Sequence, residues 1–285
     1  MPPKRVDAFD VYEFQVVIAE DKGHFTAIGR DKRGTEVQRF TSINLDDARN
    51  EIRQVLSALS DDFVGYQGAI NQFLRVYPKG FEDPFFLADE RAYKLKAHEK
   101  AKILLGKEVL VEQIKNHKYS DVCASARKVF INLIFPNEGM AFKSFVERPK
   151  NAEAFCPRFF QLLYGLDFDS AFDDLSALLA PAGAAKWTIL TYWPFILFPD
   201  RHVFMKPEVA QEAARRLGDS FDYQSRPSAA VYFKYLGFAR RLRENISDLE
   251  PRDNIDIQTF MYAVGKSGFV REGEKQRREW ELRRH

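Results

Sequence analysis

Cysteine is scarce in this sequence, since only Cys123 and Cys156 occur among 285 residues. A small secreted domain held together by disulfide bonds would carry more of them, so that class is excluded and a reducing, cytoplasmic location is expected. Both cysteines fall in segments with helical periodicity, where we expect them to be reduced, buried and unreactive. The sequence predicts no tightly bound metal and no cofactor.

Long hydrophobic runs are also missing. The longest apolar stretch, residues 189–199, is too short to span a bilayer, which takes about 18 or more consecutive apolar residues. The first ten residues carry charges instead of the apolar run of a signal peptide. We therefore expect a soluble intracellular protein with no membrane partner.

The chain has little excess of either charge sign. It contains 43 Lys and Arg residues against 41 Asp and Glu residues. No global field therefore draws it to nucleic acid. Locally, residues 90–150 hold thirteen basic and seven acidic groups. This excess predicts a docking face for a nucleic acid or a protein, although the solvated side of amphipathic helices has the same composition.

A pattern typical of strands opens the chain. Apolar and polar residues alternate over residues 12–19, 25–30 and 35–43, and glycine turns separate these segments. The pattern predicts a small three-stranded antiparallel sheet. Asn44 can cap a following helix whose apolar positions repeat at helical spacing and would cover one face of the sheet.

Helical periodicity dominates the rest of the chain, with breaks at prolines and glycines. The predicted fold class is α+β, mainly α. The predicted units are a sheet and helix domain (residues 1–60), a helical domain (61–270) and a charged mobile tail (271–285). The tail is predicted because its residues are charged and lack apolar periodicity.

Residues 178–218 carry the most specific pattern. A stretch of small residues, Ala180-Pro181-Ala182-Gly183, precedes an aromatic helix, then Asp200-Arg201-His202-Val203, then Arg216-Leu217-Gly218. This order resembles the helix-hairpin-helix DNA glycosylases. Pro181 stands where the first glycine of that family's hairpin would be.

The resemblance implies roles for individual residues. Gly183 would approach a DNA phosphate, Asp200 would be the catalytic acid that stabilises the cation formed as a flipped base leaves its sugar, and Lys186 would be an amine nucleophile. The further candidate binding residues in this segment are Tyr192, Trp193, His202 and Lys206.

The same segment also has a purely structural interpretation. The helix over residues 187–198 is apolar nearly all round, which is typical of the centre of a helical domain. Asp200 would then end a helix in a turn, His202 would be a partly buried turn residue, and Lys186 would extend into solvent.

A second resemblance concerns residues 10–59. A three-stranded sheet followed by a helix is similar to the amino-terminal DNA-binding domains of tyrosine integrases and to plant AP2 domains, whose sheet enters the major groove. The contacts would be made by Arg30, Lys32, Arg33 and Arg39. Because residues 1–60 hold nine basic and ten acidic groups, a sheet that only caps the helical domain or mediates pairing fits at least as well.

Two polar patterns have structural interpretations. Glu90, Lys94 and His98 lie four residues apart and predict an exposed ladder on one helix face. Asp253 or Asp256 is expected to cap the last long helix.

Two functions remain open. The first is a non-enzymatic intracellular interaction protein, associated with DNA or with a protein partner, that docks through the basic helical face. The second is a DNA glycosylase-like enzyme with Asp200 as its catalytic acid. The oligomeric state does not follow from the sequence.

Overall fold

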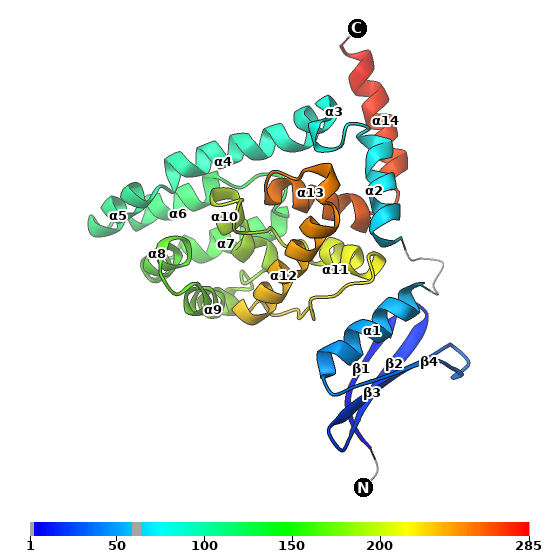
Figure 1. Ribbon diagram of the computed structural model, residues 1–285. Coiled ribbons are helices and arrows are strands. Elements are labelled where there is room, and N and C mark those ends of the chain that lie inside the picture. Colours follow the sequence, from blue (N-terminus) through cyan, green and yellow to red (C-terminus); the bar gives the residue numbers. More distant parts are fainter. Residues whose placement is uncertain (1–2, 59–63, 285) are drawn as a thin grey trace.

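The protein consists of a small sheet-bearing part and a large helical part. The computed structural model describes residues 3–58 and 64–284. Each part has its own hydrophobic core, and the sheet projects from one end of the helical part (Figure 1). The predicted boundary between residues 60 and 61 lies outside the described residues.

The sheet has four strands. They are β1 (Lys4–Val11), β2 (Phe14–Asp21), β3 (His24–Arg30) and β4 (Glu36–Ser42). All neighbours are antiparallel, in the order β1-β2-β3-β4.

The prediction of three strands is therefore wrong, because it missed β1. This edge strand carries charged residues, and its pairing shifts register between Arg5 and Asp7, so its alternation is weak. The turn to β2 is formed by Tyr12, at φ 54°, and Glu13. Neither glycine nor asparagine marks that turn in the sequence.

Helix α1 (Leu45–Ala58) covers one face of the sheet, as predicted. Asn44 begins it, because its side-chain oxygen accepts from the backbone N–H of Asp46 at 2.8 Å. Ile52 and Leu56 are fully buried against the strands. Gly29 lets α1 approach, since a Cβ there would lie 2.5 Å from the Leu56 side chain.

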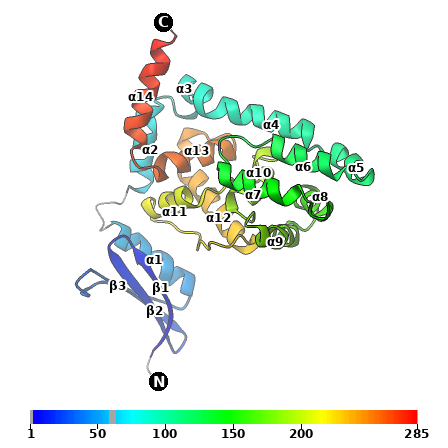
Figure 2. The same cartoon turned by 180° about the vertical axis from the view of Figure 1, so that it is seen from behind.

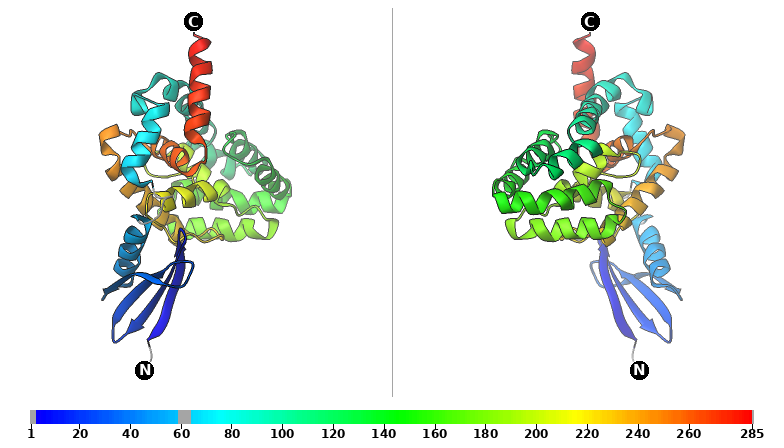
Figure 3. Two further views of the ribbon diagram at one scale, coloured as in Figure 1. Left: turned by 90° about the vertical axis from the view of Figure 1, so that its right-hand side faces the viewer. Right: turned by 90° about the vertical axis from the view of Figure 1, so that its left-hand side faces the viewer.

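The remaining helices form the larger part of the molecule (Figures 2 and 3). They are α2 (Gly65–Val76), α3 (Pro84–Phe86), α4 (Ala92–Leu104), α5 (Lys107–Lys115), α6 (Tyr119–Lys128), α7 (Pro136–Val146), α8 (Pro149–Tyr164), α9 (Phe168–Leu179), α10 (Trp187–Leu197), α11 (Pro207–Arg216), α12 (Ala229–Asn245), α13 (Asn254–Gly265) and α14 (Phe269–Leu282). None of the helices in the described residues is long and apolar enough to cross a membrane.

Helix α10 forms the centre of the larger core. All of its side chains are buried, and it packs against α4, α8 and α9. The structural interpretation of this aromatic segment is therefore confirmed. Cys123 and Cys156 are also buried and form no disulfide, as expected.

The predicted charged tail is instead helix α14, which packs on α2. Phe269 and Gly273 are buried, and Gly273 approaches Val76 so closely that a Cβ would lie 2.7 Å from it. Arg277 donates to the carboxylate of Asp83 at 3.0 Å. The contact face thus uses a glycine and an arginine at helical spacing, which a search for apolar residues does not detect.

A cluster of ion pairs joins α13 to the segment before α4. Asp253 caps α13, as predicted, and also pairs with Arg91 at 2.6 Å. Asp256 pairs with Arg91 at 2.8 Å and with Arg252 at 2.9 Å. The predicted exposed ladder is wrong at Lys94, whose side chain is 1% exposed.

Candidate functional site

Asp200 lies in an exposed turn that follows α10. The backbone N–H groups of Arg201 and His202 donate to the carbonyl of Phe198 and close this turn. Asp200 is not among the residues that line four cavities in the described part of the chain. The carboxylate therefore faces solvent and is not enclosed in a base-sized pocket.

Gly183 and Lys186 lie between α9 and α10. Gly183 follows a short 3-10 turn, Ala180–Ala182, and its φ of 67° suits a glycine. Lys186 is the residue immediately before α10, and both Gly183 and Lys186 are exposed. They are accessible, but no cavity among those described holds them together with Asp200.

Tyr192 and Trp193 are not available to a ligand, which corrects the resemblance-based prediction. Both side chains are 0% exposed. The Tyr192 hydroxyl donates to the carbonyl of Val129 at 2.5 Å, and the Trp193 indole N–H donates to that of Ala126 at 2.9 Å. They are core residues with satisfied polar atoms.

His202 is a partly buried turn residue that stacks on aromatic rings. Its ring centre lies 4.8 Å from that of Phe168 and 6.2 Å from that of Tyr232. Burial, assisted by the Arg201 cation, lowers the pKa of His202 to about 4. Lys206, the residue before α11, has its ammonium group 4.6 Å from the ring centre of Phe135.

The low pKa of His202 predicts a loss of stability in acid. The folded protein binds this proton only near pH 4, whereas the unfolded chain binds it near pH 6.5, so acidification favours unfolding between these values. We expect the protonation of His202 to lower the free energy of unfolding by about 2–3 kcal/mol between pH 7 and pH 4.5. Urea unfolding of the wild type and of His202→Phe at both values measures it. An equal loss in both proteins would contradict the assignment.

The basic residues predicted on the sheet are Arg30, Lys32, Arg33 and Arg39. Because Gly29 faces α1, its neighbour Arg30 lies on the opposite, open face of the sheet. Arg39 pairs with Ile28 and shares that face. Glu36 binds Arg39 at 2.8 Å and neutralises it. Lys32 and Arg33 are exposed in the turn between β3 and β4.

The region of residues 90–150 contains exposed cations that make no ion pair within the described chain. We call them the α4–α8 cations: Lys96, Lys100, Lys107, Lys115, Lys118, Lys128, Arg148 and Lys150. In the same described region, three exposed acids lack an ion pair: Glu108, Glu112 and Asp121. The predicted excess of positive charge is therefore present on the surface and is not cancelled by local pairing.

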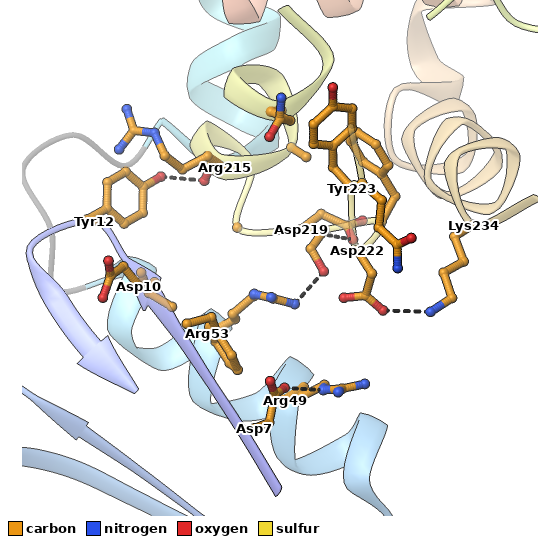
Figure 4. A pocket seen from close by; sticks show the side chains of 18 residues that line it. Asp7, Asp10, Tyr12, Arg49, Arg53, Arg215, Asp219, Asp222, Tyr223 and Lys234 are labelled. Carbon is orange, nitrogen blue, oxygen red and sulfur yellow. Dashed lines mark hydrogen bonds and ion pairs between the residues drawn. The ribbon is translucent and has the colours of Figure 1, made fainter. Parts of the chain in front are cut away.

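A cleft lies where β1 and α1 face the loop between α11 and α12 (Figure 4). Two adjoining cavities of about 600 and 690 Å³ share Arg49, Arg53, Asp222 and Lys234 in their walls. Each is large enough for a small organic molecule, and ligand sites often form at such junctions between domains.

Polar contacts between described residues join the two parts beside this cleft. The Tyr12 hydroxyl donates to the carbonyl of Arg215 at 2.6 Å, and the guanidinium of Arg215 lies 4.4 Å from the centre of the Tyr12 ring. On the other side, Arg53 donates to the hydroxyl of Ser220. These contacts connect the sheet-bearing part to the helical part beside the cleft.

Most charges in the cleft are paired. The pairs are Arg49 with Asp7 at 2.7 Å, Lys234 with Asp222 at 2.9 Å, Arg241 with Asp219 at 2.7 Å and Arg215 with Glu212 at 2.7 Å. Burial opposes ionisation of Asp222, but Lys234 and the nearby arginines outweigh it and lower its pKa. The Asp222 carboxylate is thus held ionised, as a binding group and not as a proton donor.

Sequence reasoning singled out none of these cleft residues. Arg49 and Arg53 are four residues apart on α1, which signals a shared helix face. Ser220, which Arg53 contacts, lies 167 residues further along the chain. No local pattern connects positions at that separation.

The fold is thus that of an α+β protein, mainly helical, with a small antiparallel sheet. Comparison with models of protein families, with curated proteins and with solved structures finds no match. The function is therefore argued from the residues of this chain alone.

Proposed function

We propose that the protein is a non-enzymatic binding protein that docks onto double-stranded DNA through the α4–α8 cations. The observation that supports this proposal is their number: eight exposed cations without ion pairs, against three such acids, in the described part of residues 90–150. A duplex presents a dense row of phosphates, and each cation that replaces a condensed counterion adds affinity.

The kind of side chain favours a duplex over a single strand. Lysine binds phosphate as a point charge, and contacts to phosphate carry no information on base sequence. In the described part of residues 90–150, the exposed large apolar side chains are Leu95, Ile103, Val109, Met140 and one aromatic residue, Phe135, whose ring is contacted by Lys206. Single-stranded nucleic acid is usually held by several stacking aromatic side chains, and a single exposed ring does not provide them. We therefore expect binding that depends on charge and not on sequence.

The positions of the other candidates support binding over catalysis. Asp200 is exposed in a turn, and Tyr192 and Trp193 are buried, so these residues do not surround a flipped base. Additional DNA contacts from Arg30 and Arg39 on the open sheet face stay a prediction, as does the cytoplasmic location.

The proposal is tested by reversing four charges and measuring DNA binding. The variant carries Lys96→Glu, Lys100→Glu, Lys107→Glu and Lys115→Glu, all exposed positions on α4 and α5. Fluorescence anisotropy with a 30-base-pair duplex is recorded over a series of salt concentrations. We expect the wild type to lose affinity steeply with salt, and the variant to bind at least about tenfold more weakly at low salt.

The control variant has the same net charge change at another place. It carries Arg240→Glu, Arg271→Glu, Lys275→Glu and Arg278→Glu, exposed positions on α12 and α14. Its Kd for the duplex should lie within about threefold of the wild-type value, because salt screens charges that are far from the bound DNA. Equal weakening in both variants, or wild-type affinity that does not change with salt, would refute docking through the α4–α8 cations.

A further inference from the structure

Arg53 differs from the other cations of the cleft. Arg49, Arg215, Lys234 and Arg241 each pair with a carboxylate at 2.7 to 2.9 Å. No carboxylate of the described residues lies within ion-pair distance of the Arg53 guanidinium, whose hydrogen-bond partner is the neutral hydroxyl of Ser220. A charged group in this position lacks the counterion that its neighbours have.

The surroundings of Arg53 make a guanidinium without a paired carboxylate energetically unfavourable. Its guanidinium lies 4.3 Å from the centre of the Phe9 ring, which shields one side from water. Burial lowers the pKa of Arg53, although the more distant carboxylates of Asp222, Asp7 and Asp219 favour its charged form. A guanidinium has five N–H donors, and one hydroxyl satisfies few of them.

The loop opposite Arg53 is held in an unusual conformation. Asp222 has a φ of 48°, in the left-handed region that a non-glycine residue adopts at a cost on the order of 1–2 kcal/mol. Its carboxylate pairs with Lys234 on α12 at 2.9 Å. In this conformation Ser220, Asp222 and Tyr223 line the cleft, and the positions of Asp222 and Tyr223 can be followed in Figure 4.

We propose that this cleft binds a small organic oxyanion, with its carboxylate or phosphate group on Arg53. An oxyanion can take two parallel hydrogen bonds from a guanidinium, which supplies the missing counterion. The Ser220 hydroxyl can turn to donate to the same group. Tyr12 and Tyr223, on opposite sides of the cavity, provide ring surface for the organic portion (Figure 4).

This site is separate from the α4–α8 cations and takes a different ligand. Its cavity of about 600 Å³ is lined by residues of β1, α1 and the α11–α12 loop, and by none of those eight cations. The shared chemistry is an anionic oxygen group, which a free small molecule or a DNA phosphate could provide. The experiment therefore contains an arm for each source.

Isothermal titration calorimetry of the full chain tests the proposal with phenyl phosphate, benzoate and inorganic phosphate as probes. We expect one-to-one binding of phenyl phosphate or benzoate with Kd below about 1 mM, and weaker binding of inorganic phosphate, which has no ring to contact the tyrosines. A 30-base-pair duplex at saturating concentration should change the Kd of the probe by less than about threefold. Competition by the duplex would overturn the assignment to a small molecule.

The variant Arg53→Gln should weaken probe binding at least about tenfold, whereas Arg240→Gln, a change at an exposed arginine of α12, should not affect it. Ser220→Ala keeps the Arg53 charge and should bind within about fivefold of the wild type. If Arg53→Gln does not fold, Arg53→Lys keeps the charge but loses the planar donor pair, and should bind at least about threefold more weakly. No saturable binding by the wild type, or unchanged affinity in the folded Arg53 variant, would overturn the proposal.

Discussion

Replacing Asp256 with alanine is expected to destabilise the protein by about 3–5 kcal/mol. The Asp256 side chain is 0% exposed and accepts from the guanidinium groups of Arg91 and Arg252 and from the backbone N–H of Arg252. Its removal leaves Arg91, which is 10% exposed, with one carboxylate fewer in a site that water reaches poorly. Urea unfolding measures the loss as a lower midpoint at constant m-value.

Two further variants serve as comparisons for Asp256→Ala. Asp256→Asn keeps the volume and part of the hydrogen bonding, so its loss should be smaller than that of alanine. Glu279→Ala removes an exposed ion pair with Lys275, 3.9 Å long, and should cost less than about 0.5 kcal/mol. A loss below about 1 kcal/mol for Asp256→Ala would show that the ion cluster does not hold α13 to the segment before α4.

Trp193→Ala is expected to cost a similar amount, about 3–5 kcal/mol, for a different reason. The indole is 0% exposed and packs against the rings of Phe130, Phe142 and Phe159, with centres 5.0 to 5.5 Å away. Truncation leaves a cavity in the centre of the helical part and also removes the partner of the Ala126 carbonyl. Thermal and urea unfolding both measure the change.

Trp280→Ala provides the matched control. Trp280 lies on α14, is only partly buried and contacts Phe85 at a ring-centre distance of 5.5 Å. Its loss should cost less than half as much as that of Trp193, because solvent fills the space that it leaves. If Trp193→Ala kept wild-type stability, the side chain would be a surface residue open to a ligand, as the glycosylase resemblance implies.

Local sequence patterns predicted the elements whose partners are close in the chain. The spacing of Ile52 and Leu56 predicted the buried face of α1, and Asn44 predicted where that helix begins. The nearly all-apolar composition of residues 187–198 predicted, in its structural interpretation, that α10 is buried. In each case the signal is periodicity or capping, which involves residues only a few positions apart and can therefore be recognised in the sequence.

The predictions that failed depended on what an element packs against. Strand β1 carries charges because it is an edge strand, and it becomes a strand only by pairing with β2. Helix α14 buries Gly273 and pairs Arg277 with Asp83, which lies 194 residues away in the chain. Lys94 was expected in solvent, but Glu90 and Thr259 satisfy its ammonium group in a buried position.

The candidate sites divide in the same way. The excess of basic residues between positions 90 and 150 is a property of composition, so the sequence alone determined it, together with the mainly helical α+β class of fold. The cleft at Arg53, the exposure of Asp200 and the burial of Asp256 were decided only by the tertiary structure. Charge and helical spacing can be read from neighbouring residues in the sequence. Burial and the supply of a counterion depend on residues that lie more than 160 positions apart in the chain and that folding brings together.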